Sequence, residues 1–579
     1  MSPKVDLLSD LAQALQQTGR DSLVVALGLR GDLNASIGSA VNGTFVFTLP
    51  TVQTTVDVTC EIVLRQKMNP PGGAALPPEP ACVPVGRRGP VYEFSPSLPK
   101  AFVASMGGVR QLGGKIVTFV GGNASAEKSV PTVFIPASAF VVADGPARGV
   151  QRPSAAATGT KKVLVARMRS TTHGQEPTPT INDLKERVFG MGISPVAVNF
   201  KSQSAACSEN ELIIEPGACV SGNTAPGCAE ISDGVMNLDL DMDLSPGVDP
   251  SEVEYAAVVK LNALGLRDAA TADYVMFLFP PGISPWIAYA YINGWSSFYS
   301  DTWGGSVSAH MHEVGHNFGL AHSGEFDEEY GDESSYMGYS FLSIGWPAMC
   351  YHGGQHRSLG WYSTHTTEIA ASDFVSGQNE LVDLFAFTDV QALSAGDPVI
   401  IKLDVASPRG YALYLQYNKA EDHNSGVVES ANLITVVQDA LDTPAYQQSW
   451  KVASLGEGDD YDDNLRVKVC SLDVVGSVDV VRLSISLDYI GDPCPPPSLS
   501  PPPAPLEWWE ILLIALGALI GIILLSLCIL RVCFARTVEI DMVPAAPARA
   551  DPIRSEHRRI PQSRSDIAPS TTREKTFDL

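Results

Sequence analysis

Three histidines and one glutamate share one short segment of the chain, His312-Glu313-Val314-Gly315-His316-Asn317-Phe318-Gly319-Leu320-Ala321-His322. Residues four apart on a helix project from the same face, so His312 and His316 can both offer an imidazole nitrogen to one ion. Gly319 can take the left-handed backbone that ends a helix, after which the chain can present His322 as a third ligand. The spacing therefore predicts a zinc site whose fourth position is open to water.

Glu313 follows the first histidine directly and is placed beside such a water. Three neutral histidines keep zinc strongly electrophilic, which can lower the pKa of bound water to about 7, and Glu313 can then take its proton. The alternative is that Glu313 forms only a salt bridge on the helix surface. We expect Val307, Met311, Val314 and Phe318, which fall at helical spacing, to pack on the side away from the histidines.

A second signal is the run Ser335-Tyr336-Met337-Gly338-Tyr339, which follows the last histidine and predicts a tight turn that carries a methionine. It resembles the Met-turn beneath the zinc of metzincin metalloproteases, in which Met337 would hold that place. Astacin-like and serralysin-like metzincins place a tyrosine near the zinc at the position of Tyr339. The resemblance implies that the Tyr339 hydroxyl helps to hold the developing oxyanion, and a packing tyrosine is the alternative.

From about Lys161 to Tyr489, the chain resembles the gametolysin family, the matrix and cell-wall proteases of green algae. Besides the histidine motif, the resemblance rests on Val163-Leu164-Val165-Ala166-Arg167, Ala206-Cys207-Ser208, Trp286-Ile287-Ala288-Tyr289-Ala290-Tyr291-Ile292-Asn293, Ser323-Gly324-Glu325 and Leu359-Gly360-Trp361. Some members carry Gln at the position of His312, and members often carry Cys at the position of Ser335. The resemblance implies a twisted sheet above a zinc helix, a lower subdomain with the Met-turn, a cleft between them, and protein substrates.

The composition fits a multidomain protein outside the cytosol. The chain has 579 residues, of which 45% are hydrophobic and 18% charged, and its formal charge is −25. So acidic a surface repels phosphates, which argues against nucleic acid as a partner. Eight of the ten cysteines precede residue 500, an even number that indicates disulfides and an oxidising compartment. Three N-x-S/T triplets, which begin at Asn34, Asn42 and Asn123, are consistent with a glycoprotein.

Ile511 to Leu530 is an apolar segment of twenty residues without charge. Twenty helical residues span roughly 30 Å, the thickness of the hydrocarbon core of a bilayer. Trp508 and Trp509 precede the segment and Arg531 follows it, which predicts a transmembrane helix with the arginine on the cytoplasmic side and the catalytic region outside. A buried core helix is the alternative. Because Met1 to Arg20 is polar and unlike a signal peptide, we expect the true N-terminus to lie upstream.

The predicted fold class is α+β, with a metzincin-type zinc protease domain flanked by β-rich domains and followed by one transmembrane helix. Expected helices lie near Ile181 to Phe189 and at Pro250 to Leu264, and Tyr274 to Phe279 reads as a buried strand. The expected divisions are 1–155, a β-rich N-terminal (pro)domain; 160–370, the metzincin catalytic domain; 375–490, a C-terminal β-sandwich; 494–507, a Pro-rich stalk; 508–531, the transmembrane helix; and 532–579, a disordered cytoplasmic tail.

Four further features leave alternatives open. Cys82 can form a disulfide with Cys60 or hold the zinc through its thiolate and keep a zymogen latent. Asp239, Asp241 and Asp243 alternate with apolar residues, which predicts a strand with one wet face, with a calcium site as the alternative. The acidic stretch from Asp327 to Glu333 is expected to be a solvated loop, or to favour basic substrate residues. His310 matches no ligand spacing and is expected to be structural or exposed.

The combined prediction is a membrane-anchored zinc metalloendopeptidase with Zn²⁺ as its cofactor, an extracellular catalytic domain at the cell surface, and protein substrates. The substrate class, Pro-rich glycoproteins of an extracellular matrix or cell wall, is what the resemblance implies. The alternative function is a catalytically idle surface module that keeps the protease fold for adhesion. Such modules commonly lose the glutamate or a ligand, whereas all four residues are present here.

Overall fold

In the computed structural model, the described residues are 55–142 and 157–487, each with gaps, together with Cys494. The chain divides into the units 1–495 and 496–579, and the second unit lies wholly outside the described residues. The predicted stalk beyond Cys494, the transmembrane helix at 508–531 and the cytoplasmic tail at 532–579 therefore also lie outside them. No helix within the described ranges is long and apolar enough to cross a membrane.

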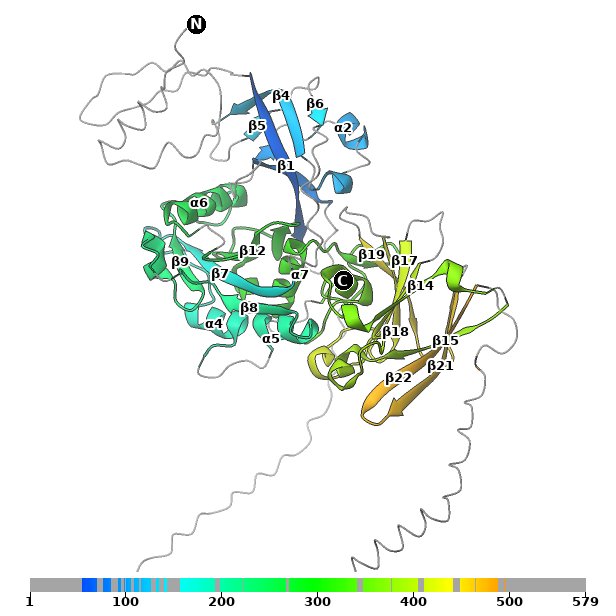
Figure 1. The fold of residues 1–579 in the computed structure, drawn as a ribbon. Helices are drawn as coiled ribbons and strands as arrows, with labels where there is room; N and C mark the ends of the chain where they lie inside the picture. The colour runs from blue at the N-terminus through cyan, green and yellow to red at the C-terminus, as the bar shows by residue number, and fades with distance from the viewer. Residues whose placement is uncertain are drawn as a thin grey trace, which may run out of the picture. The chain divides into compact units, whose positions relative to one another are not determined.

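A mostly parallel sheet forms the centre of the protein (Figure 1). Its parallel strands are β7 (Gly159–Arg169), β8 (Leu212–Pro216), β9 (Val235–Asp239), β10 (Tyr274–Phe279) and β12 (Ser296–Ser300). The strand β11 (Ala288–Tyr291) runs antiparallel to β12. Such a sheet is buried on both faces because helices cover it, and all six residues of β10 are buried as the prediction required.

The helices divide between the two faces of this sheet. Val163 and Val165 of β7 pack in one core with α4 (Ile181–Phe189), α5 (Phe200–Cys207) and α7 (Val307–Asn317). Leu164 and Ala166, which point to the opposite face, pack in a second core with α6 (Pro250–Ala263). Figure 1 shows α6 and the pair α4 and α5 on opposite sides of the sheet. The predicted helices at 181–189 and 250–264 are confirmed, the second to within one residue.

Strands from the N-terminal region extend the same sheet. They are β1 (Thr55–Met68), β2 (Glu79–Pro84), β3 (Glu93–Phe94), β4 (Ile116–Ser125), β5 (Thr132–Phe134) and β6 (Phe140–Val142), with the short helix α2 (Lys100–Ser105). The end of β1 pairs antiparallel with β11, from Arg65 opposite Tyr291 to Met68 opposite Ala288. A sheet of twelve strands results, and it runs from the N-terminal region into the region of the histidines.

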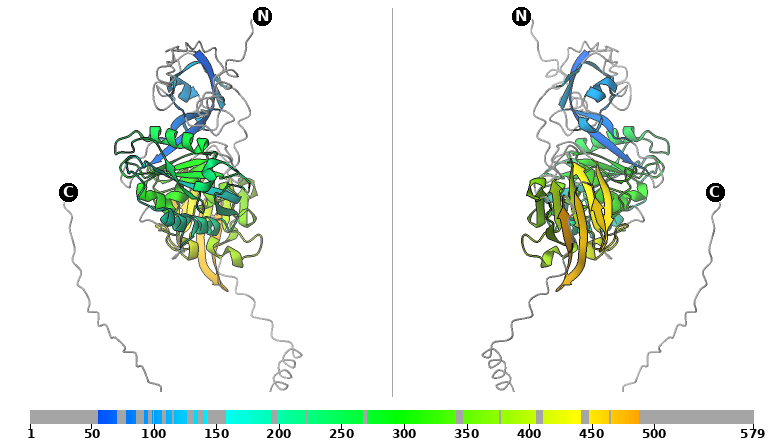
Figure 2. Two further views of the ribbon diagram at one scale, coloured as in Figure 1. Left: turned by 90° about the vertical axis from the view of Figure 1, so that its left-hand side faces the viewer. Right: turned by 90° about the vertical axis from the view of Figure 1, so that its right-hand side faces the viewer.

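The C-terminal region forms two sheets that share one core. One has the order β13 (Ser323–Glu325), β19 (Ser449–Leu455), β18 (Ile434–Ala440), β17 (Tyr411–Tyr417), β16 (Ile400–Asp404) and β14 (Thr366–Ala370). The other has the order β15 (Glu380–Phe385), β22 (Val478–Ser486), β21 (Arg466–Val475) and β20 (Asp460–Asp462). Leu403 and Leu415 of the first sheet pack with Val467 and Leu483 of the second, which gives the layered arrangement in Figure 2.

Two of these strands come from before residue 375, where the C-terminal domain was expected to begin. They are β13, directly after the last histidine of the motif, and β14. Between them lies the helix α8 (Gly353–Leu359). Because β13 pairs with β19, the segment that directly follows His322 belongs to the C-terminal sheet. The predicted domain boundaries stay predictions.

Four disulfides pair the eight cysteines, Cys60–Cys82, Cys207–Cys350, Cys219–Cys228 and Cys470–Cys494. The prediction of disulfides is confirmed. Cys82 of β2 forms a disulfide with Cys60 of the neighbouring strand β1, so its thiol is not available as a latency switch in this structure. The alternative of a zinc-binding Cys82 is therefore not supported.

Candidate metal centre

The helix α7 carries the first two histidines of the motif. Ser306 caps its first turn by accepting a hydrogen bond from the Ala309 backbone. The helix ends as predicted, since Gly319 has φ 96° and donates from its backbone N–H to the carbonyl of His316. In contrast to the expectation of one packed face, every residue of α7 is buried, because residues of the Met-turn region cover the histidine side as well.

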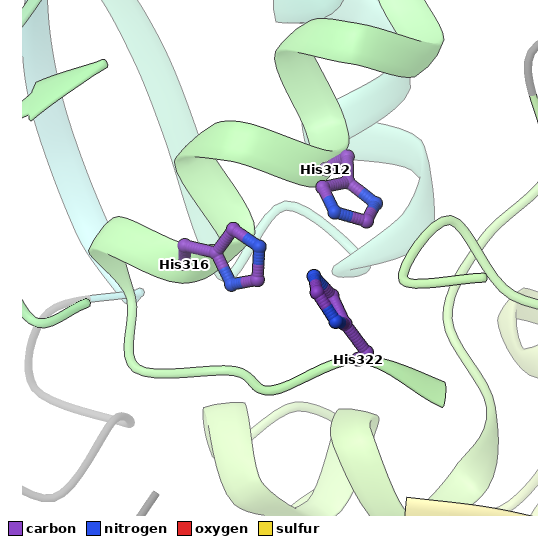
Figure 3. Close-up of side chains that lie close together, drawn as sticks. All are labelled: His312, His316 and His322. Atoms are coloured by element: carbon purple, nitrogen blue, oxygen red, sulfur yellow. The ribbon is translucent and has the colours of Figure 1, made fainter. Parts of the chain in front are cut away.

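His312, His316 and His322 come together as predicted, with one ligand atom from each lying within 4.8 Å of the others. Figure 3 shows the three rings turned toward a common point, two from α7 and the third from the chain that follows it. Each side chain is at most 1% exposed. Within the described part of the chain, this is the group of His, Cys, Asp or Glu residues that could hold a metal ion.

Hydrogen bonds define which nitrogen of each imidazole faces inward. His312 Nδ1 lies 2.7 Å from the carbonyl oxygen of Tyr336, and His316 Nδ1 lies 2.8 Å from that of Leu320. His322 Nδ1 lies 2.8 Å from Oε1 of Glu329. All three partners are acceptors, so each Nδ1 must carry the proton and donate it, which leaves the Nε2 lone pair for a metal.

The protonation state of the cluster also fits a cation. Burial lowers the pKa of His312 well below its ordinary value and lowers the pKa of His316 to about 4. His312 and His316 are therefore neutral near pH 7, which is the form that binds metal. Three buried imidazoles suit zinc and other borderline divalent ions. The donor set fits a metal ion, and zinc is the ion that such a set most often holds in proteins.

Glu313 lies on the same helix and is also fully buried. Neither of its carboxylate oxygens has a hydrogen-bond partner among the described residues. Burial accordingly raises the pKa of Glu313 well above its ordinary value. The alternative of a salt bridge on the helix surface is wrong, because the side chain does not reach the surface. A buried carboxylate with no partner indicates a role that involves a bound ligand or water.

Met337 lies against the histidine helix. A Cβ added at Gly315 would come 2.7 Å from Sδ of Met337, so the two residues are in close contact. The turn also contributes the carbonyl of Tyr336 that orients His312, and the Met337 carbonyl accepts from the backbone of Ser323. The predicted methionine turn is therefore part of the support of the cluster.

Tyr339 is connected to the histidines through the ring of Tyr330. It stacks on Tyr330 with 4.8 Å between ring centroids, and Tyr330 lies with its ring 4.0 Å from that of His322. Burial raises the pKa of the Tyr339 hydroxyl. Its role toward an oxyanion stays a prediction.

Sequence reasoning missed Glu329, the carboxylate that orients His322. It was expected to belong to a solvated acidic loop, and that expectation is wrong for Glu329 and for Asp332, which is fully buried. Both have cationic or proton-donating partners that compensate for burial, namely His322 and Lys451. Asp327 and Glu328 are exposed as predicted. The sequence feature that could have indicated this role is the position of Glu329, seven residues after the ligand His322.

The other candidates from the sequence have structural roles. His310 is fully buried, and its Nε2 lies 2.8 Å from the carbonyl oxygen of Gly304. The strand β9 ends at Asp239, so the three alternating aspartates are not on one strand face. Asp239 pairs with Arg169, and Asp243 accepts from Ser245 and Gln175. A shared calcium site is not supported.

The fold and site together are those of an α+β protein with a metallopeptidase-like histidine cluster. Residues 162–442 match the family Gametolysin peptidase M11, and over this region the chain belongs to that family. The resemblance inferred from the sequence is confirmed. A segment of 98 residues is 33% identical to "Autolysin" of Chlamydomonas reinhardtii, and it covers 15% of this chain and 14% of that protein.

Proposed function

We propose that the protein is a zinc-dependent metalloendopeptidase. The observation that carries the proposal is the cluster of three buried histidines, each oriented through Nδ1, with an unpartnered buried glutamate on the same helix. The family supports a metallopeptidase. Zinc as the ion, and the roles of the single residues, are our proposal.

When bound to the three imidazoles, zinc supplies Lewis-acid polarisation of the scissile carbonyl and of the attacking water. His312, His316 and His322 hold the ion, and their Nδ1 hydrogen bonds keep the rings from turning away. Glu313 then takes a proton from the attacking water on a carboxylate oxygen and passes it to the leaving amine. Because no described residue forms a hydrogen bond with its oxygens, this carboxylate is free to move a proton in both steps.

We further propose that the N-terminal strands are a prosegment that closes the site. The Tyr330 hydroxyl donates to the backbone carbonyl of Lys67 on β1, at 3.2 Å, and the Tyr330 ring lies on His322. The neighbouring residue of β1, Met68, is buried in the same core as Tyr330 and Met337. The histidines are almost without solvent exposure in this arrangement, so a peptide needs these groups to move before it can reach them.

The location and substrates are also proposals. Four disulfides support an oxidising compartment. The uncharged segment Ile511 to Leu530 supports one membrane anchor with the peptidase outside. Pro-rich glycoproteins of a matrix or cell wall follow from the family resemblance.

The experiment is Glu313→Gln in the purified protein, with His322→Ala as its companion. Glutamine has the shape of glutamate without its basicity, so the first variant should keep one zinc per chain and lose on the order of a hundredfold or more in peptide hydrolysis. The second should lose zinc itself. Full hydrolysis by the glutamine variant would overturn the mechanism. Bound zinc without any hydrolysis by wild type, tested on a broad peptide library, would favour the idle adhesion module.

A further inference from the structure

The backbone that carries the third histidine is bonded to a strand far along the chain. The carbonyl of His322 accepts from the backbone N–H of Ser449, at 3.2 Å. The three residues after His322 then form β13, which runs parallel to the start of β19 with Ser323 opposite Ser449 and Glu325 opposite Lys451. His322 is therefore held in place by the C-terminal sheet, whereas His312 and His316 are held by α7.

Glu329, which orients His322, is held by the same segment. The side-chain amide of Gln448 donates to the backbone carbonyl of Glu329, at 2.8 Å. Gln448 is 9% exposed, so this bond is largely protected from water. Residues 448 to 451 thus contact both the histidine and its carboxylate partner. They lie beyond residue 442, where the match to the peptidase family ends.

Lys451 is a cation inside this arrangement, with no exposed side-chain surface. Its Nζ lies 2.5 Å from Glu429, 3.4 Å from Glu325 and 3.6 Å from Asp332. Asp332 is fully buried and also accepts from Ser323 and Ser334. Glu325 and Asp332 lie near the two ends of the loop that carries Glu329. One buried ammonium therefore joins both ends of this loop to β19.

We propose that Lys451 and Gln448 are positioning residues of the metal centre and that the centre extends beyond the family region into β19. The inference rests on the proposed metal site. Without the ammonium, the fully buried Asp332 and the partly buried Glu325 lose the cation that they share, and the loop must open to hydrate Asp332. That movement displaces Glu329 and His322, and the protein therefore binds the metal more weakly. Substitution of groups that orient metal ligands typically lowers affinity about 10–100-fold.

The chain offers a matched control in Lys419. Its side chain is 7% exposed, and its Nζ lies 3.0 Å from Asp389, 3.1 Å from Glu421 and 3.3 Å from Asp479. It is thus another mostly buried lysine with three carboxylates in the C-terminal region. None of these carboxylates belongs to the loop between His322 and Met337. Removal of this cation should lower stability without a specific effect on the metal.

The experiment compares full-length wild type, Lys451→Met and Lys419→Met, each measured below its own unfolding temperature. The zinc dissociation constant is determined by competition with a chelator, and thermal unfolding is followed in parallel. We expect Lys451→Met to bind zinc about 10-fold or more weakly, while Lys419→Met melts earlier but stays within about twofold of wild type for zinc. Equal zinc affinities in the two variants would overturn the inference.

A milder variant covers the case in which Lys451→Met does not fold. Gln448→Leu removes the hydrogen bond to the Glu329 carbonyl and leaves every buried charge paired. We expect it to weaken zinc binding several-fold, and wild-type affinity in folded Gln448→Leu would then overturn the inference. Failure of the proposed function is a separate outcome, because wild type itself would then bind no zinc.

Discussion

Acidification from pH 7 to pH 5 should destabilise the protein through two histidines outside the metal centre. His352 is 1% exposed and caps α8, since its Nδ1 accepts from the backbone N–H of Gln355 at 3.2 Å. Its Nε2 must therefore carry the proton and donate to Ser449, 2.7 Å away. A second proton would have to displace the cap. His356 is fully buried on the same helix.

The magnitude follows from proton linkage. Burial lowers the pKa of His352 to about 3 and that of His356 to about 3, whereas an unfolded histidine has a pKa of about 6.5. Between these values the unfolded chain binds a proton and the folded chain does not, so stability falls as the pH falls from about 6.5 toward 3. Integration from pH 7 to pH 5 gives a loss of about 2 kcal/mol for each histidine, or about 4 kcal/mol for both. That is a large share of an ordinary net stability of about 5–15 kcal/mol.

The assay is urea unfolding of wild type and His352→Asn at both pH values. Asparagine can still accept the capping hydrogen bond but does not titrate. The variant can be less stable at pH 7, yet between the two pH values it should lose about 2 kcal/mol less than wild type. Substitution of the exposed His173 by Asn serves as control. The linkage argument is refuted if His352→Asn loses as much stability on acidification as wild type.

Three further outcomes are expected. Tyr339→Phe should lower the turnover number in peptide hydrolysis while zinc content and melting temperature stay unchanged, and wild-type turnover would assign Tyr339 to packing. A specific cleavage site placed within residues 143–156, once cut and freed of the N-terminal fragment, should give protein with faster hydrolysis than the uncut chain; equal rates would exclude a closing prosegment. Protease added to intact cells should remove an epitope placed before Trp508 and spare one placed after Arg536, and the reverse pattern would disprove the proposed topology.

Local patterns in the sequence predicted a large part of the fold. The helix at Ile181–Phe189 and the strand at Tyr274–Phe279 have the predicted bounds, because apolar periodicity and the residues at the ends of each element are local signals. The histidine spacing likewise predicted the cluster, since two ligands lie on one helix turn and the third follows a single glycine turn. The cysteine count predicted disulfides, and Cys60–Cys82 was one of the alternatives for Cys82, but the other three pairings were not predicted.

The sequence by itself determined which residues can form a metal centre and on which local elements they stand. Only the tertiary structure decided what supports them. Glu329 is the partner of His322 and not a solvated residue, because the loop that carries it is bonded to β19 and to Lys451 on that strand. This contact is distant in the sequence, since Ser323 and Ser449 are 126 residues apart. In the same way, β1 joins β11 next to the cluster. Periodicity along a strand records which face is buried, and it carries no information about which distant strand will pair with it.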